Sequence, residues 1–82
     1  MLTVQYLARY RDVLECDSEQ LPWQEDWRSV EDVRQFLIAR QGAWTVLEDP
    51  RLMCARNQDM CSLEEALQPG DELALFPMVT GG

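Results

Sequence analysis

Histidine and lysine are both missing from this 82-residue sequence. Without histidine the chain has neither the commonest general base nor the commonest metal ligand. Without lysine it cannot form a Schiff base. It has four glycines, and their positions build no glycine-rich phosphate loop, so any ATP must be bound by another protein. The chain therefore lacks the residues that most often provide acid–base, Schiff-base and phosphate-binding chemistry in an enzyme that acts alone.

Positive charge is also scarce, because seven arginines stand against 15 acidic residues and the formal net charge is −8. Nucleic acids and anionic membranes are bound by basic surfaces, so neither is an expected partner, whereas a protein with a positive surface is. No apolar run approaches the roughly 20 residues of a membrane span. The N-terminus lacks a basic region followed by an apolar run, so we expect no signal peptide. With an odd number of cysteines, three, we expect reduced thiols and a cytoplasmic location.

The cysteines offer little chemistry of their own. Cys54 lies in an apolar segment, which favours a small buried hydrophobe. Cys54 and Cys61 match no zinc-ligand spacing and no histidine completes a site, so no metal site is predicted. A persulfide on one of these thiols is the alternative that the residues leave open.

The pattern predicts one small domain, residues 1–82, with seven elements. They are a strand at 1–8, a short helical turn at 9–15, a weak strand at 18–23, a helix at 30–41, a hairpin at 51–62, a short helix at 62–67 and a strand at 72–77. Ser29 is the expected N-cap of the main helix, Asp32 favours its first turn, and Gly42 is the expected C-cap. One amphipathic helix on one mixed sheet is the economical arrangement for this order.

The last strand has an inner and an outer face. Alternation places Leu73 and Leu75 inward with Pro77, whereas Glu72 marks the opposite face as solvent-exposed. Phe76 lies on that outer face, and Leu7 occupies the same position on the first strand. Exposed apolar residues are common, but these two flank the C-terminal tail. We therefore expect Phe76, Leu7 and Met60 to form a docking patch.

The sequence ends on FPMVTGG, with five residues after Pro77. Frayed ends are common, but two glycines add conformational entropy and no packing. A chain without Cβ atoms is thin enough to enter a narrow channel, and five extended residues reach roughly 17 Å. We therefore expect residues 78–82 to be a flexible tail that presents its terminal carboxylate to another protein.

Four segments that together span the chain resemble one family. They are the opening LTVQYLARYRDVL, the helix SVEDVRQFLIARQ, the segment LEDPRLMCARNQ and the ending GDELALFPMVTGG. They are similar to the small subunits of molybdopterin synthase, which are sulfur carriers of the MoaD and ThiS type. Met78 departs from the family, which usually has a second proline there, and this should loosen the tail slightly.

The resemblance implies an α+β, β-grasp (ubiquitin-like) fold, in which a mixed sheet packs on one main helix. It also implies a sulfur-carrier mechanism in molybdenum cofactor biosynthesis. An adenylating, E1-like activating enzyme uses ATP to adenylate the carboxylate of Gly82, and sulfur transfer then gives a thiocarboxylate. The tail enters the large synthase subunit, where the sulfur converts cyclic pyranopterin monophosphate (precursor Z) to molybdopterin.

In this scheme the chain is a non-catalytic subunit of a heterotetramer and binds no cofactor itself. Gly82, preceded by Gly81, is the reactive end. The tail residues expected to contact partners are Pro77, Met78, Val79 and Thr80. Two alternatives share the fold and the Gly-Gly end: a sulfur carrier of the thiamine pathway and a ubiquitin-like protein modifier.

Overall fold

Strands and helical segments follow one another largely in the predicted order, except that one helical segment is added and one predicted short helix is missing from the described residues. The computed structural model describes residues 1–78. The elements are β1 (Leu2–Tyr6), α1 (Arg9–Leu14), β2 (Ser18–Leu21), α2 (Val30–Ile38), the 3₁₀ helix η1 (Gly42–Glu48), β3 (Met53–Arg56), β4 (Asp59–Cys61) and β5 (Glu72–Phe76). The 3₁₀ helix η1 is the element that the sequence pattern does not predict.

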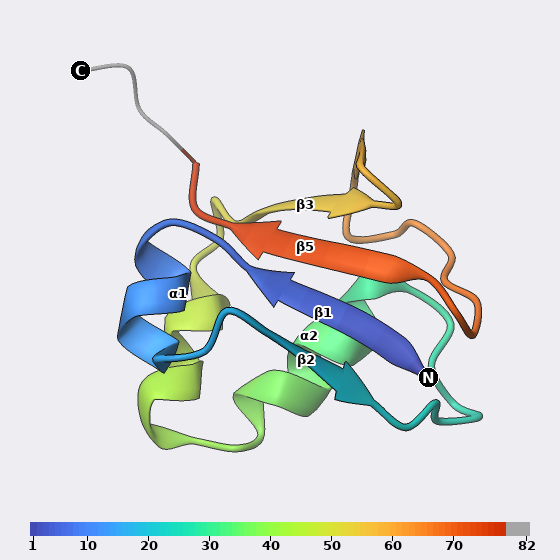
Figure 1. Ribbon diagram of the computed structural model, residues 1–82, viewed down its shortest axis with the longest axis horizontal. Helices are drawn as coiled ribbons and strands as arrows, with labels where there is room; N and C mark the ends of the chain where they lie inside the picture. Colours follow the sequence, from blue (N-terminus) through green and yellow to red (C-terminus); the bar gives the residue numbers. More distant parts are fainter. Residues whose placement is uncertain (79–82) are drawn as a thin grey trace.

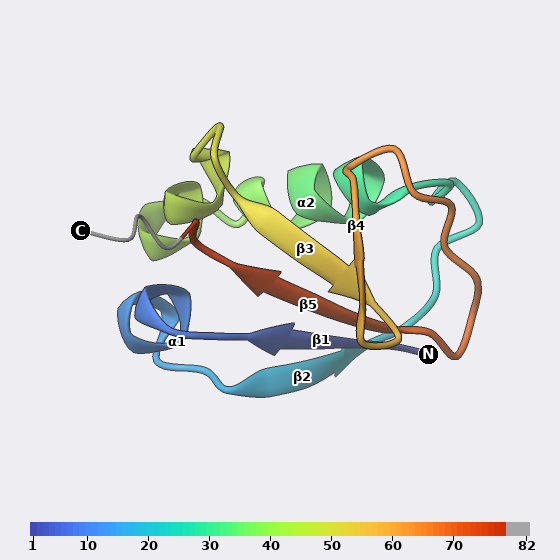
Figure 2. The same cartoon turned by 90° about the horizontal axis from the view of Figure 1, so that it is seen from above.

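The five strands form one mixed sheet in the order β2-β1-β5-β3-β4. The two strands nearest the chain ends, β1 and β5, pair in parallel, with Val4 opposite Leu73 and Tyr6 opposite Leu75. The other pairings are antiparallel. The α2 helix and η1 lie on one face of the sheet and leave the other face uncovered (Figures 1 and 2). The predicted α+β class, with a mixed sheet on one main helix, is confirmed.

The core lies between the covered face of the sheet and the helical segments. Alternate residues of β1 and β5 are buried, as the period of two requires. The fully buried side chains of the core are Leu2, Val4, Tyr6, Tyr10, Val30, Val33, Leu37, Leu47, Leu73 and Leu75. The predicted inward face of the last strand is therefore correct.

The main helix begins as predicted and ends earlier. Asp32 accepts hydrogen bonds from the backbone amides of Arg28 (2.9 Å) and Ser29 (3.1 Å), which satisfies donors that the first turn leaves free. The helix ends at Ile38 with Ala39 as its C-cap, so the predictions of a helix to residue 41 and of Gly42 as its cap are wrong. Gly42 instead begins η1, with a φ of +63°.

Side-chain contacts of Arg40 connect the segment after α2 with β2 and η1. Arg40 donates two hydrogen bonds to the carboxylate of Glu19 on β2, at 2.8 and 3.1 Å. Glu19 also accepts a hydrogen bond from the hydroxyl of Tyr6 at 2.7 Å. The guanidinium of Arg40 stacks over Trp44 of η1, 4.5 Å from the ring centroid. The chain turns after α2, and η1 then packs on the core.

The short helix predicted at residues 62–67 is absent from the described structure. The segment forms a turn at Leu63 and Glu64, and Ala66 then makes an antiparallel bridge to Ser29. Carbonyls of this segment accept hydrogen bonds from the first amides of α2, Glu65 from Val30 at 3.1 Å and Leu63 from Glu31 at 3.0 Å. An extended course is favoured here because it satisfies amides that the helix start leaves unpaired.

Two turns bring the strands into register, and the first belongs to the predicted hairpin. Asn57 and Gln58 connect β3 and β4, and both have positive φ (+50° and +73°), as a type I′ hairpin turn requires. Gly70 has a φ of +93°, and the Asp71 amide donates to the Gln68 carbonyl at 3.1 Å, as in a type II turn. Across residues 1–78, no helix is long and apolar enough to cross a membrane.

Candidate functional site

Because β1 and β5 are parallel, their C-terminal ends lie side by side at the same end of the sheet. The amide of Leu7, just after β1, donates to the carbonyl of Leu75 at 3.0 Å and so fixes the two strand ends together. Pro77 follows β5 directly and is half-buried, whereas the side chain of Met78 is exposed. The chain leaves the sheet at this end (Figure 1).

An apolar patch occupies the uncovered face of the sheet beside this point. We call it the sheet patch, and its residues are Leu7, Met53, Ala55, Met60, Ala74 and Phe76. Met53 lies opposite Phe76, and Ala55 lies opposite both Ala74 and Met60, so these side chains share one face. Because Tyr6 pairs with Leu75, the next residue, Leu7, lies beside Phe76.

The predicted docking residues thus occupy one surface. The side chain of Leu7 is 40% exposed and that of Met60 is 59% exposed, whereas Phe76 is half-buried. Sequence reasoning missed Met53, although its place opposite Phe76 follows once the hairpin register is known. The function of this surface as a docking site stays a prediction.

The remainder of the uncovered face is polar. Alternation along β1, β2 and β5 places polar residues there: Thr3, Gln5, Ser18, Gln20 and Glu72. The sheet patch is therefore confined to the half of the face that includes the chain exit and the β3–β4 hairpin.

The predicted reactive tail begins at the edge of the described structure. Val79, Thr80, Gly81 and Gly82 lie outside the described residues. The predictions for their roles, including the Gly82 carboxylate, are therefore carried forward as proposals. Of the predicted tail, residues 78–82, only Met78 is described.

A network around Asp71, which sequence reasoning missed, fixes the β3–β4 hairpin against the start of β5. Asp71 accepts hydrogen bonds from Arg56 Nε (2.8 Å), Asn57 Nδ2 (3.1 Å) and the Gln68 amide (2.8 Å). The backbone amide of Asn57 donates to the Glu72 carbonyl at 2.7 Å. Burial alone would raise the pKa of Asp71, but these donors hold it below its usual value. The network fixes Met60 relative to the rest of the sheet patch.

The thiols are poorly suited to nucleophilic chemistry. Cys54 is buried in the core as predicted, and its sulfur lies 3.6 Å from that of Cys61. Burial raises the pKa of Cys54 to about 12, and burial also raises the pKa of Cys61. Both thiols are therefore protonated at neutral pH. Among the described residues, no three His, Cys, Asp or Glu side chains are arranged to hold a metal ion.

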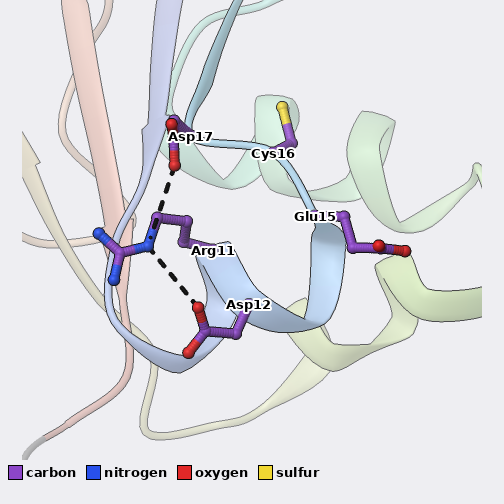
Figure 3. A pocket seen from close by; sticks show the side chains of 5 residues that line it. All are labelled: Arg11, Asp12, Glu15, Cys16 and Asp17. Atoms are coloured by element: carbon purple, nitrogen blue, oxygen red, sulfur yellow. Dashed lines mark ion pairs between the residues drawn. The ribbon is translucent and has the colours of Figure 1, made fainter.

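A pocket of about 370 Å³ lies at the end of α1 (Figure 3) and is lined by Arg11, Asp12, Glu15, Cys16 and Asp17. The Nε atom of Arg11 is 3.7 Å from Asp12 Oδ1 and 3.9 Å from Asp17 Oδ1, while Glu15 points away from it. Burial raises the pKa of Cys16, so this thiol is not an activated nucleophile. The pocket contains charged groups without a nucleophile and base aligned for catalysis.

Comparison with known proteins adds sequence evidence to this geometry. Residues 4–82 match the ThiS family. The chain is 40% identical to the molybdopterin synthase sulfur carrier subunit of Haemophilus influenzae and 37% identical to that of Escherichia coli. Each alignment runs over 83 residues and covers 100% of both proteins.

Solved structures share the fold. SAMP1 from Haloferax volcanii superposes with a TM-score of 0.75 at 27% identity, covering 99% of this chain and 98% of that one. A chain from the complex of subunits 1 and 2 of the molybdopterin-converting factor of Helicobacter pylori gives a TM-score of 0.67 at 17% identity, covering 99% and 97%. At that identity the second likeness supports the fold alone.

Proposed function

The chain belongs to the ThiS family, and from this membership we propose that it is the sulfur carrier subunit of a molybdopterin synthase. The observation that carries the proposal is the end-to-end match to two sulfur carrier subunits of this synthase, at 40% and 37% identity. The likeness to solved structures adds the β-grasp fold. The thiamine-pathway alternative has no comparable support.

The proposed chemistry takes place at the carboxylate of Gly82. A carboxylate at neutral pH is a poor electrophile, so it must first be activated. In a partner adenylating enzyme, a carboxylate oxygen attacks the α-phosphorus of ATP and pyrophosphate leaves. Hydrosulfide (HS⁻) from a sulfur donor then attacks the acyl carbon and displaces AMP, so that sulfur takes the place of one terminal oxygen and a thiocarboxylate results.

The thiocarboxylate then delivers its sulfur in the large synthase subunit, where cyclic pyranopterin monophosphate is converted to molybdopterin. The chain's own groups fit a carrier rather than a catalyst. Its thiols are protonated at neutral pH, and it contains neither histidine nor lysine. ATP, the activating step and the pterin are therefore handled by partners, and the chain supplies one end group.

The described residues form a surface beside the point where the tail begins. Pro77 fixes the direction in which the chain leaves β5, and the sheet patch lies beside that exit. A partner that covers Phe76 and Leu7 therefore has the tail positioned at the edge of the interface. The relatives from Haemophilus influenzae and Escherichia coli are named as subunits of a synthase, which supports a second synthase subunit as the partner.

The test is intact-mass measurement after co-expression with an adenylating enzyme and a sulfur donor. The wild-type chain should show the mass increase of one oxygen-to-sulfur exchange at its C-terminus. A variant extended by one residue after Gly82 should show none, because its former carboxylate is an amide. A Cys16→Ala variant, altered at a thiol away from the tail, should be modified like the wild type.

Full activity with the extension still attached would contradict the proposal and direct attention to the cysteines. Covalent attachment of the chain to other proteins, without molybdopterin formation, would favour the ubiquitin-like modifier instead.

A further inference from the structure

A second pocket, of about 210 Å³, lies beside the chain exit. The residues that line it include two arginines and one aspartate, whereas the whole chain is strongly negative. The pocket is lined by Ala8, Arg9, Asp49, Arg51, Pro77 and Met78. Arg9 opens α1 and Arg51 follows η1, so two distant segments bring their guanidinium groups to the point where β5 ends. We call Arg9 and Arg51 the exit arginines.

The exit arginines are only loosely held. Arg9 Nη2 lies 3.9 Å from Asp49 Oδ2, and Arg51 Nε lies 3.7 Å from Asp49 Oδ1, both beyond hydrogen-bond distance. Their side chains are 62% and 65% exposed. By contrast, Arg40 and Arg56 each donate short hydrogen bonds to carboxylates. Within residues 1–78, the donors of the exit arginines remain available to a ligand.

Asp49 neutralises only one of these two charges. Its carboxylate accepts hydrogen bonds from the Arg51 amide (2.9 Å) and the Tyr10 hydroxyl (3.3 Å), so its position is fixed. The amide of Arg51 is the main cause of a lowered pKa for Asp49, which therefore stays ionised at neutral pH. Two guanidinium groups against one carboxylate leave one positive charge, on a chain whose net charge is −8.

We propose that the exit arginines bind a carboxylate on the large synthase subunit, at the entrance of the channel that receives the tail. This inference rests on the proposed sulfur-carrier function. Pro77 and Met78 line the same pocket, so any surface that admits the following residues must approach Arg9 and Arg51. The guanidinium fork matches the geometry of a carboxylate.

Charges at the rim of an interface act mainly on association rate and orientation. The exit arginines therefore select the docking orientation in which the tail faces the channel. The negative surface elsewhere on the chain would be repelled by the same carboxylate. Association should be faster than for a chain of uniform negative charge.

The experiment is stopped-flow association of the chain with its large subunit at low and high salt. Arg9→Gln and Arg51→Gln should each slow association at low salt, and the double variant should be slower by about threefold to tenfold. The salt dependence of the double variant should be shallower, and its dissociation rate should change by less than about twofold. Lysine at both positions should restore most of the association rate.

Arg28→Gln is the matched control. It removes the same charge from an exposed arginine at the opposite end of the sheet, where the Arg28 carbonyl accepts a hydrogen bond from the Leu67 amide. Equal slowing in Arg28→Gln would reduce the effect to net charge and overturn the inference. So would unchanged association of the double variant. Failure of the proposed function looks different, because the wild-type chain would then neither bind the large subunit nor gain sulfur.

Discussion

Replacing Phe76 with alanine tests whether the sheet patch is a docking surface. The ring lies on the uncovered face, opposite Met53 and beside Leu7, and is half-buried in the free chain. A partner that covers the patch would remove the remaining exposed ring from water. Truncation of a central aromatic in an interface costs about 2 kcal/mol or more. That corresponds to a roughly thirtyfold weaker Kd.

The cost to folding should be smaller than for a core residue. Truncating a fully buried phenylalanine costs about 3–5 kcal/mol. The ring of Phe76 is only half-buried, so its truncation should cost only part of that. A loss of about 1–2 kcal/mol is expected, against a total stability of about 5–15 kcal/mol for such a domain. Each kcal/mol lowers the Tm by about 4–8 °C. Phe76→Ala should therefore remain folded in the binding assay.

The chain offers two controls. Phe36→Ala removes the same ring from α2, where Phe36 is 38% exposed and packs on Trp27 at a centroid distance of 5.2 Å. It should lose similar stability and keep wild-type binding. Leu75→Ala, one residue earlier on β5 but fully buried, should lose about 2–5 kcal/mol of stability.

The assay is titration calorimetry with the large subunit, paired with thermal unfolding of each variant. Wild-type binding by Phe76→Ala would refute the docking assignment. A stability loss as large as that of Leu75→Ala would place the Phe76 ring in the core and reverse the assignment of faces.

Three further predictions concern the tail, the Asp71 network and the missing lysines. Gly81→Ile should leave the melting curve unchanged and abolish product formation with the large subunit. Deleting Gly82 should have the same two effects, because the deletion withdraws the carboxylate by about 3.5 Å. A displacement of 1 Å can already cost about a hundredfold in rate. The pKa of Asp71 is lower in the folded state than in the unfolded chain, so ionised Asp71 stabilises the fold. This contribution is fully present above the usual pKa of about 4, and it is lost as the pH falls through the pKa of the folded state. Asp71→Asn should therefore lose about 1–3 kcal/mol at pH 7 and show a smaller difference between its urea midpoints at pH 7 and pH 3 than the wild type. Because the sequence contains no lysine, the activated chain should form no lysine-linked polymer of itself, and a ladder of such conjugates by mass spectrometry would contradict this.

The elements that the sequence predicts well are those with local signals. Alternation identifies the inner face of β5, and the hairpin predicted at 51–62 contains β3 and β4. Ser29 and Asp32 place the start of α2 correctly because capping is decided within one turn. Each of these features depends on residues that are neighbours in the sequence.

The errors arise where distant contacts decide the local structure. Gly42 has the positive φ expected of a C-cap glycine, yet α2 ends earlier, and the segment after it contacts β2 through the hydrogen bonds of Arg40 to Glu19. The segment with Ala66 has helix-forming residues, yet it runs extended because it bridges to Ser29. The Asp71 network joins segments that are far apart in the sequence, so no local pattern of residues predicts it. The candidate docking residues were nevertheless placed on one surface, because strand alternation alone assigns Phe76 and Leu7 to the outer face.

The position of β5 in the sheet has a consequence for how the chain is made. Of the five strands this one is synthesised last, yet it lies between β1 and β3 and pairs with both. The sheet therefore cannot close on the ribosome until β5 has emerged, and folding must wait for the contact between β1 and β5. Such long-range pairing is expected to slow folding. A polypeptide cut short before β5 would lack the strand that joins β1 to β3, and its sheet would be divided into two separate pairs of strands.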